Sequence, residues 1–188
     1  MYRPPFNDWT DRDAMVAFCN AHPFALFIST DLHEKRPVAT HIPAMVREVD
    51  GELVCTLHIA KANAQWKGLE DEVLLVFSGP HAYISPSGYT QIDVPTWNYI
   101  AVHVYGVAQI ISDSDEVRSR LKLLVDEHDH SELWKQLQDA NEVDPLLNGI
   151  VMIDVRVTDM QGKRKLSQNR NEHDRAYGER LVIPPSQA

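Results

Sequence analysis

The sequence predicts a mainly β protein of the α+β class, in which helices flank an antiparallel barrel. Extended segments outnumber helical ones, and hairpin-length connections join successive extended segments. The 188 residues contain no repeat and no low-complexity linker, and they are enough to bury the core of one domain. We therefore expect a single domain over residues 1–188, with helices at about residues 113–139 and a polar C-terminal tail.

The N-terminal part predicts one helix and one strand. Thr10 offers a capping hydroxyl, and Asp13 follows three residues later, so we expect the helix to begin there. Apolar residues then recur at helical spacing until Pro23 ends the helix. The short apolar run at 24–29 is typical of a strand.

A hairpin is predicted next. Residues 38–46 form an extended segment, in which Pro43 indicates an edge or a bulge. Residues 49–51 supply a turn, and 53–59 form the return strand.

The middle of the chain predicts a helical turn at 63–69 and a buried strand at 73–77, closed by 78–80. Residues 81–95 are rich in Pro, Ser, Gly and Tyr, so we expect mostly loop there, with a short strand at 82–84.

The longest strand signal covers 97–111, with Gly106 as a bulge and the alternate residues from Val102 to Ile110 on one apolar face. Asp113 is expected to cap a helix, and Ser131 to begin a shorter one.

Residues 149–157 return to a strand, with apolar side chains on one face. From Asp159 onward the chain is polar and basic, and we expect it to fray into a tail.

Composition limits the class of protein and its compartment. No stretch approaches 18 uninterrupted apolar residues, and the N-terminus lacks the pattern of a secretory signal, so we expect no membrane span. Cys19 and Cys55 lie in apolar patterns and are expected to be buried free thiols, which indicates the cytoplasm. The net charge of −9, from 27 acidic and 18 basic residues, argues against direct binding to DNA.

Familiar catalytic motifs are missing from the sequence. It contains no GxGxxG, Walker loop, HExxH, GxSxG or CxxC, and no nucleophile–base pair stands at motif spacing. His128 and His130 flank Asp129, but two ligands without a third favour a solvated turn over a metal site. We therefore expect no metal and assign no catalytic residue.

Four polar clusters are embedded in extended segments, at residues 40–41, 58–63, 95–99 and 162–169. They combine hydrogen-bond donors with positive charge, as a phosphate carried on a polyol chain requires. A flat strand face beside them would receive a planar ring. The alternative interpretation is a set of unrelated capping and surface residues.

Four strings within these regions stand in order along the chain: HIAKANAQWK, VFSGPHAYISPSGY, VPTWNYIAVHVYG and GKRKLSQNR. Together with the opening MYRPPFN they resemble the PaiB-type family of FMN-binding negative transcriptional regulators, over nearly the whole chain. That family is similar to the pyridoxamine phosphate oxidase-like split barrels. The resemblance therefore implies an antiparallel FMN-binding split β-barrel that forms a homodimer with two flavin sites at its interface.

The resemblance also implies roles for individual residues. Lys61 and Asn63 would hold the FMN phosphate, assisted by His58, while Thr40 and His41 would line the ribityl chain or the ring edge. Thr96, Trp97 and Asn98 would approach from the partner subunit. The residues that would close the site near the ring or phosphate are Lys163, Lys165, Ser167, Gln168 and Asn169.

Some of these residues also have a simpler interpretation. Trp97 can be a core residue, His58 a satisfied strand histidine, and residues 163–165 a solvated face. The chain departs from the family's usual Gly, Pro and Trp at Leu57, Ala64 and Gly88, and the loss of a ring at Gly88 predicts a wider pocket or a looser lid.

Three functions follow from the resemblance. The first is a flavin-binding regulatory protein that senses redox or metabolic state. The second is a flavin-dependent oxidoreductase of the pyridoxamine phosphate oxidase-like class, acting on a small molecule with an indirect regulatory effect. The third is a haem-handling protein. The helices predicted after Asp113 are acidic and lack the glycine turn of a helix-turn-helix, which favours flavin binding over direct DNA recognition.

Overall fold

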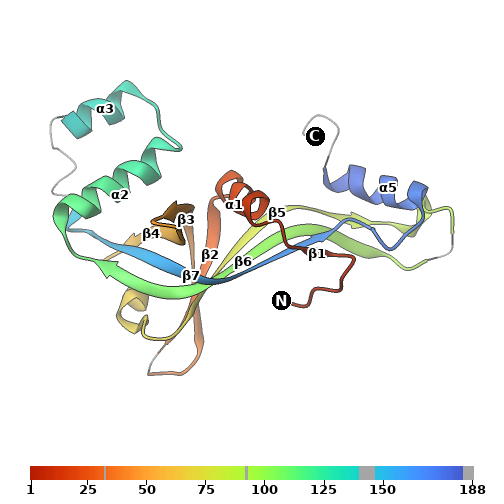
Figure 1. Cartoon of the computed structure of the whole chain (residues 1–188), viewed down its shortest axis with the longest axis horizontal. Helices are drawn as coiled ribbons and strands as arrows, with labels where there is room; N and C mark the ends of the chain where they lie inside the picture. Colours follow the sequence, from red (N-terminus) through yellow and green to blue (C-terminus); the bar gives the residue numbers. More distant parts are fainter. Residues whose placement is uncertain (32, 92, 140–146, 184–188) are drawn as a thin grey trace.

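The computed structural model describes residues 1–31, 33–91, 93–139 and 147–183. An antiparallel sheet closes on itself in the strand order β7-β4-β3-β2-β5-β6, and β6 pairs back with β7 (Figure 1). The short strand β1 pairs with the far end of β7. The strands are β1 (Asp8–Trp9), β2 (Phe24–Thr30), β3 (Pro37–Val49), β4 (Glu52–Ala60), β5 (Val73–Ile84), β6 (Thr96–Ile111) and β7 (Ile150–Lys165). The predicted mainly β, antiparallel class is confirmed.

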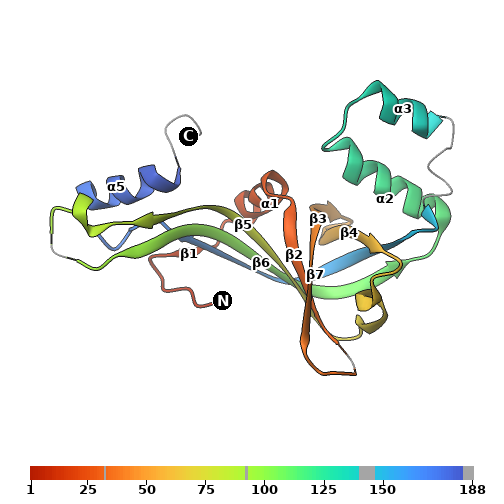
Figure 2. The same ribbon diagram turned by 180° about the vertical axis from the view of Figure 1, so that it is seen from behind.

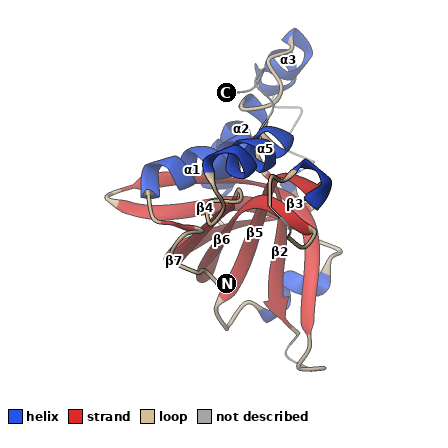
Figure 3. Ribbon diagram, turned by 90° about the vertical axis from the view of Figure 1, so that its right-hand side faces the viewer, coloured by secondary structure: helices blue, strands red, loops and turns tan. Residues whose placement is uncertain are grey.

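The α-helices lie on one side of the sheet, as the end view in Figure 3 shows. Along the long axis, α2 and α3 stand at one end and α5 at the other, with α1 between them (Figure 2). Their bounds are α1 (Arg12–Ala21), α2 (Ser114–Asp126), α3 (Glu132–Asp139) and α5 (Glu172–Val182), with short 3-10 turns at η1 (Ala64–Gly68) and η2 (Pro86–Gly88). Within the described ranges no helix is long and apolar enough to cross a bilayer.

The core fills the barrel with side chains from alternate strand positions. Every second residue of β2 from Ala25 onward is buried, and Phe27, Leu57, Leu75 and Ile153 are wholly inaccessible to solvent. Alternation arises because successive side chains of a strand point to opposite faces of the sheet.

Both cysteines belong to this interior. Cys19 on α1 and Cys55 on β4 are free and buried, as the sequence predicts. Burial raises the pKa of the Cys19 thiol to about 12, because the thiolate would lose its hydration there.

The β3–β4 hairpin follows the predicted turn chemistry. Asp50 and Gly51 have φ of 52° and 83°, and they connect the paired residues Val49 and Glu52. Two central residues with positive φ suit the right-handed twist of the flanking strands. Strand β3 lies between β4 and β2, so the edge expected at Pro43 is wrong; Pro43 instead stands where the pairing with β2 ends, one residue before the pairing with β4 begins.

Helix α1 begins one residue later than predicted. The side chain of Asp11, not that of Thr10, accepts a hydrogen bond from the backbone N–H of Ala14, at 3.0 Å. A carboxylate carries more negative charge toward the helix N-terminus than a hydroxyl does, which favours Asp11 as the cap.

Three expectations for the chain after residue 77 are wrong. Strand β5 does not end at 78–80 but continues to Ile84 through an irregularity between Ser78 and His81. Strand β7 extends beyond Val157 to Lys165, where the sequence predicts only a polar tail. The tail itself forms α5, capped by Asn171. Pairing of β7 with β6 accounts for its extension, because a strand that satisfies its backbone groups tolerates polar side chains.

The apolar face of β6 is predicted correctly only in part. Val102 and Val104 are fully buried, but Ile110 is 41% exposed. The register between β6 and β7 shifts at Gly106, where a Cβ atom would lie 2.3 Å from the carbonyl oxygen of Arg156. An irregularity is therefore present at the predicted place, but its extra residue is Thr158 of β7, which has no partner opposite Gly106.

A half-buried ionic cluster fastens α2 to the barrel. Asp154 on β7 accepts hydrogen bonds from Thr56 Oγ1 at 2.6 Å and from Arg120 Nε at 2.7 Å. Arg47 Nη2 on β3 lies 3.4 Å from the same carboxylate. Arg120 also pairs with Glu116 one turn earlier on α2, at 3.1 Å.

Removing Asp154 should therefore destabilise the protein strongly. We expect Asp154→Ala to lower the free energy of unfolding by about 3 kcal/mol, because two arginines lose a shared, largely buried partner. The matched control Glu116→Ala removes an exposed carboxylate from the same arginine and should cost less than about 1 kcal/mol. Denaturant unfolding of both variants measures the difference, and equal losses would contradict this role of Asp154.

Candidate functional site

The residues that the sequence assigns to a flavin fall into two separate clusters. We call the first the proximal cluster, near the beginning of β7, and the second the distal cluster, near its end. The proximal cluster contains Thr40, His41, His58, Lys61 and Asn63. The distal cluster contains Thr96, Trp97, Asn98, Lys163, Lys165, Ser167, Gln168 and Asn169.

The proximal cluster is built around a buried glutamine that sequence reasoning missed. Gln65 accepts a hydrogen bond from Thr40 Oγ1 at 2.6 Å, and its amide donates to Ser29 Oγ at 3.1 Å. Asn63 donates to Thr40 Oγ1 at 3.0 Å and accepts from the backbone N–H of Gln65 at 3.0 Å. The network holds η1 against β2 and β3. Gln65 lies two residues after Asn63 within the string HIAKANAQWK. Its place in that string was the only sequence signal that pointed to it.

Lys61 and His58 occupy the end of β4. The backbone N–H of Lys61 donates to the carbonyl of Gly149 at 2.8 Å, and the lysine side chain is exposed. His58 is half-buried, and within the described ranges its Nδ1 has no hydrogen-bond partner. Burial lowers the pKa of His58, so its imidazole is neutral at neutral pH, and its Nδ1 can donate to or accept from a ligand.

His41 follows Thr40 on β3, so its side chain points to the opposite face of the strand. Its ring is exposed on β3 and stacks on Phe24, with centroids 5.8 Å apart and an interplanar angle of 26°. Phe24 is itself 64% exposed, so this aromatic pair is open to solvent or to a partner.

The distal cluster surrounds a hollow of about 380 Å³ between β6, β7 and the N-terminal segment. Tyr99 of β6 pairs with Lys165 of β7, which brings the two strands' polar residues together. The predicted residues that line the hollow are Thr96, Asn98, Lys163, Lys165, Ser167 and Asn169. The structure thus gathers most of the distal prediction at one place.

Two lysines give this hollow its charge. Lys163 is buried, and its ammonium donates to the backbone carbonyl of Tyr2 at 3.0 Å. Lys165 donates to Thr96 Oγ1 and, at 2.7 Å, to the carbonyl of Trp97. Burial, followed by the positive charges of Lys163 and Arg170, lowers the pKa of Lys165. The contribution of these two neighbouring cations to the lowered pKa indicates a region of positive potential.

Asn98 and the loop after β7 form the base of the distal cluster. Asn98 is fully buried and donates to Ser167 Oγ at 2.8 Å, while its Oδ1 has no partner among the described residues. Ser167 has a φ of 65°, and Gly178 on α5 makes room for it, since a Cβ there would lie 2.4 Å from Ser167 Oγ. Gln168 ties the loop to itself, accepting from Leu166 N–H at 2.7 Å and donating to the carbonyl of Arg164 at 2.5 Å.

Trp97 is a surface residue rather than a core one. It is 56% exposed and lies beside the rings of Tyr83 and His81, at centroid distances of 5.9 and 6.0 Å. Asn169 is likewise exposed. An exposed group of aromatic rings next to a polar hollow is typical of an interaction surface.

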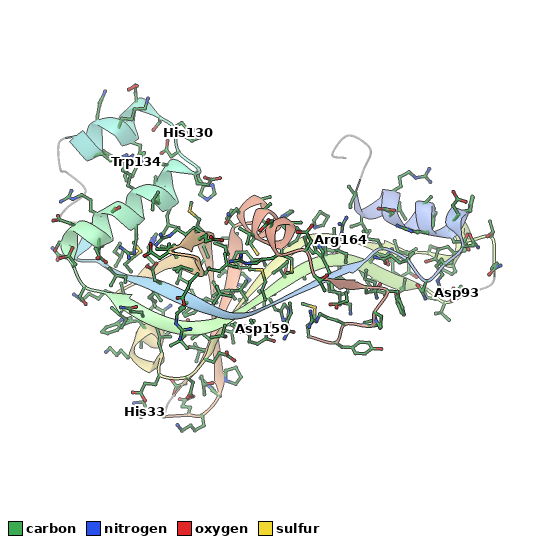
Figure 4. The ribbon with its side chains drawn as sticks, viewed as in Figure 1. His33, Asp93, His130, Trp134, Asp159 and Arg164 are labelled. Atoms are coloured by element: carbon green, nitrogen blue, oxygen red, sulfur yellow. The ribbon has the colours of Figure 1, made fainter. Side chains whose placement is uncertain are left out.

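The two clusters of one chain lie far apart. Lys61 adjoins Gly149 just before β7, whereas Lys165 is the last residue of that strand. Fifteen steps of strand span about 50 Å, so one flavin does not reach both clusters of the same chain. In Figure 4, Arg164 and Asp93 lie toward the distal end, whereas Trp134 on α3 and His130 between α2 and α3 lie at the other end.

The departures from the family pattern have local explanations. Leu57 is wholly buried in the barrel core, and Ala64 is the first residue of η1. At Gly88 a Cβ atom would lie 2.1 Å from Cζ of Tyr177. The Tyr177 ring packs edge-on against Tyr89, at 5.9 Å and 82°, so the expectation of a wider pocket at Gly88 is wrong.

Comparison with known proteins identifies the family. A family model described as "Putative FMN-binding domain" matches residues 1–159. The "Protease synthase and sporulation protein PAI 2" of Bacillus subtilis is 37% identical over 180 residues, which cover 93% of this chain and 85% of that protein. The chain belongs to this PaiB-type family of FMN-binding domains. FMN is accordingly the cofactor of the fold, as the resemblance implied.

Solved structures agree on the fold. The flavocytochrome Anf3 of Azotobacter vinelandii superposes with a TM-score of 0.70 at 22% identity, over 94% of this chain and 78% of that one. The FAD and heme binding protein of Mycobacterium smegmatis gives 0.62 at 14% identity, over 92% and 80% of the two chains. Both structures share the overall fold of this chain.

The donor chemistry of the two clusters fits FMN. The exposed ammonium of Lys61 suits a phosphate, and the hydroxyls and amides around it suit a polyol chain. The unpartnered Nδ1 of His58 and Oδ1 of Asn98 are polar atoms that a ligand would satisfy. Among the described residues no group of three or more His, Cys, Asp or Glu is arranged to hold a metal ion.

We predict that restoring the family's usual tryptophan destabilises this chain. Gly88→Trp should lower the free energy of unfolding by about 1–3 kcal/mol, because the Tyr177 ring already fills the space. In a Tyr177→Ala background the same substitution should cost clearly less. Denaturant unfolding of the four proteins measures this coupling, and an equal cost in both backgrounds would refute it.

The buried histidine of β4 should make stability depend on pH. His58 has a lowered pKa when folded, so the unfolded chain takes up its proton first as the pH falls below about 6.5. Its contribution to stability is therefore full above that pH and is lost as the pH drops through the folded pKa. As the pH is lowered from 7.5 to 5, the free energy of unfolding should fall less steeply for His58→Gln than for the unmodified chain. Denaturant unfolding at each pH measures it. An unchanged slope would show that His58 does not titrate in this way.

Proposed function

We propose that this chain is a flavin-binding regulator that works as a homodimer, with each FMN held between the proximal cluster of one copy and the distal cluster of the other. The observation that carries the proposal is the separation of the two clusters along β7. Each cluster offers groups suited to part of a flavin, and a two-fold arrangement is the simplest way for them to meet. The exposed rings around Trp97 supply apolar surface for such an interface.

The proximal cluster takes the phosphate end of FMN in this proposal. Lys61 provides the charge for the phosphate, and His58 offers a neutral ring nitrogen beside it. Thr40 and Asn63 are already bonded to each other and to Gln65, so they present a fixed polar edge to the ribityl chain. The flat pair of His41 and Phe24 lies at the edge of the ring.

The distal cluster takes the ring end. Thr96 and Lys165 line the hollow, and the exposed Trp97 adjoins Lys165. In this proposal all three face the flavin of the partner copy. Bound flavin supplies redox chemistry, and a cation such as Lys165 near the pyrimidine end of the ring stabilises its reduced anion. This cation is the observation that favours the second candidate function, a flavin-dependent oxidoreductase.

The regulatory effect is proposed to depend on the state of the flavin rather than on direct DNA contact. The chain carries a net charge of −9, and the helices α2 and α3 contain acidic residues along their length. Neutralising DNA phosphates requires a basic face. Retention on DNA that weakens with salt would favour a direct regulator, and reduction of bound FMN by a nicotinamide nucleotide would favour the oxidoreductase.

Mixed dimers give a decisive test of the shared site. Lys61→Ala and Lys165→Met should each abolish or strongly weaken FMN binding, because each removes one half of every site. An equal mixture, refolded together, should regain about one quarter of the sites, since half of the dimers are mixed and each has one intact site. Flavin fluorescence quenching on titration counts the sites, and light scattering confirms the dimer.

The control is Lys67→Ala, which removes an exposed lysine that lies over Trp66 on η1 and is not assigned to the site. It should bind FMN like the unmodified chain. A mixture that regains no binding, although the dimers exchange, would place each site within one copy and overturn the proposed arrangement.

A further inference from the structure

The hollow of the distal cluster has an unusual charge for this protein. Three cations line it, Lys163, Lys165 and Arg170, and no acidic residue lines it within the described part of the chain. Arg170 is neutralised at the rim by an ion pair with Asp93. The two lysines have no carboxylate partner among the described residues and bond only to uncharged oxygens. This local excess of positive charge contrasts with the net charge of −9 of the whole chain.

Lys163 is the deeper of the two lysines. Only 7% of it is exposed, and its ammonium lies 5.4 and 5.2 Å from the ring centroids of Tyr2 and Tyr99. Burying an ammonium is costly unless it is paired, and a backbone carbonyl is a weaker partner than an anion. The described residues supply no negative group to this ammonium, so a ligand anion can take that place.

The N-terminal segment covers the hollow loosely. Tyr2 supplies the carbonyl that Lys163 bonds to, yet its side chain is 82% exposed. Figures 1 and 2 show this segment running along the side of the β6 and β7 ribbons opposite to α5. A ligand anion can replace the Tyr2 carbonyl with a small movement of this exposed segment.

The remaining walls combine apolar surface with one unsatisfied polar atom. Phe6, Val94 and the rings of Tyr2 and Tyr99 supply apolar area, and Asn98 has a buried Oδ1 without a described partner. The volume of about 380 Å³ lies at the lower end of pockets that enclose small organic ligands.

We propose that this hollow is a ligand pocket beside the flavin, and that it binds a small planar organic anion whose carboxylate or phosphate pairs with Lys163. The planar body lies against Tyr99 and Tyr2, and Asn98 Oδ1 accepts a hydrogen bond from a donor group of the ligand. The inference rests on the proposed function, because it takes the mouth of the hollow, at Lys165, to face the flavin of a dimer.

The test uses the FMN-loaded protein with benzoate and phenyl phosphate as probes, at constant ionic strength set with chloride. Either probe should produce a saturable change in the flavin absorption spectrum while the FMN stays bound. In protein that still carries FMN, Lys163→Met should weaken the binding of the probes at least tenfold. Tyr2→Ala, at an exposed side chain, should weaken it by a smaller factor and keeps the test valid if Lys163→Met does not fold.

Three outcomes would overturn the inference. They are no saturable change with either probe, release of FMN by the probes, and unaltered binding in both variants. Release would mean that the hollow belongs to the flavin itself. Tryptophan fluorescence of the flavin-free protein, in which Trp97 adjoins Lys165, reports probe binding separately. If FMN does not bind but the probes do, the proposed flavin site fails and the anion pocket stands.

Discussion

Strand β7 is the constraint on which the rest of the structure depends. Over Met152 to Arg156 it pairs with β4 on one side and β6 on the other, and this double pairing closes the barrel. Beyond the barrel it continues along β6, and β1 pairs with it at Gly162 and Lys163. The same strand therefore begins beside one cluster of site residues and ends in the other. Barrel closure and site geometry are consequences of one set of backbone hydrogen bonds.

Local chemistry explains the part of the fold that the sequence predicts. The Asp50–Gly51 turn, the Asp113 cap of α2 and the ending of α1 before Pro23 depend on residues within a few positions of each other. The continuation of β7 past Asp159 depends instead on pairing with β6 and β1, whose residues are distant in the sequence. Its polar side chains give no strand signal, because tertiary pairing outweighs propensity there. Helix α5 was missed for a related reason, since it is mostly polar and only Asp174, Gly178 and Val182 are buried.

The candidate site divides in the same way. The motifs identify which residues carry donors and charge, because residue type is visible in a sequence. They do not show that Thr40 and Asn63 are occupied by Gln65, or that Lys163 is buried under Tyr2. Nor do they show that Lys61 and Lys165 stand at opposite ends of one strand, which only the sheet topology reveals. Because of that separation, it is not enough to ask which residues bind flavin. The proposed dimer also raises the question of which copy of the chain each residue comes from.

Charge distribution connects the fold to the kind of molecule this protein recognises. A duplex presents a long row of phosphates, and binding it needs positive charge spread over a broad face. Here the unpaired positive charge that stands out is confined to a hollow of about 380 Å³, within a chain whose net charge is −9. Such a surface repels an extended polyanion, while the hollow still attracts a small anion that fits inside it. The proposed control by a small ligand next to a flavin is consistent with this distribution of charge.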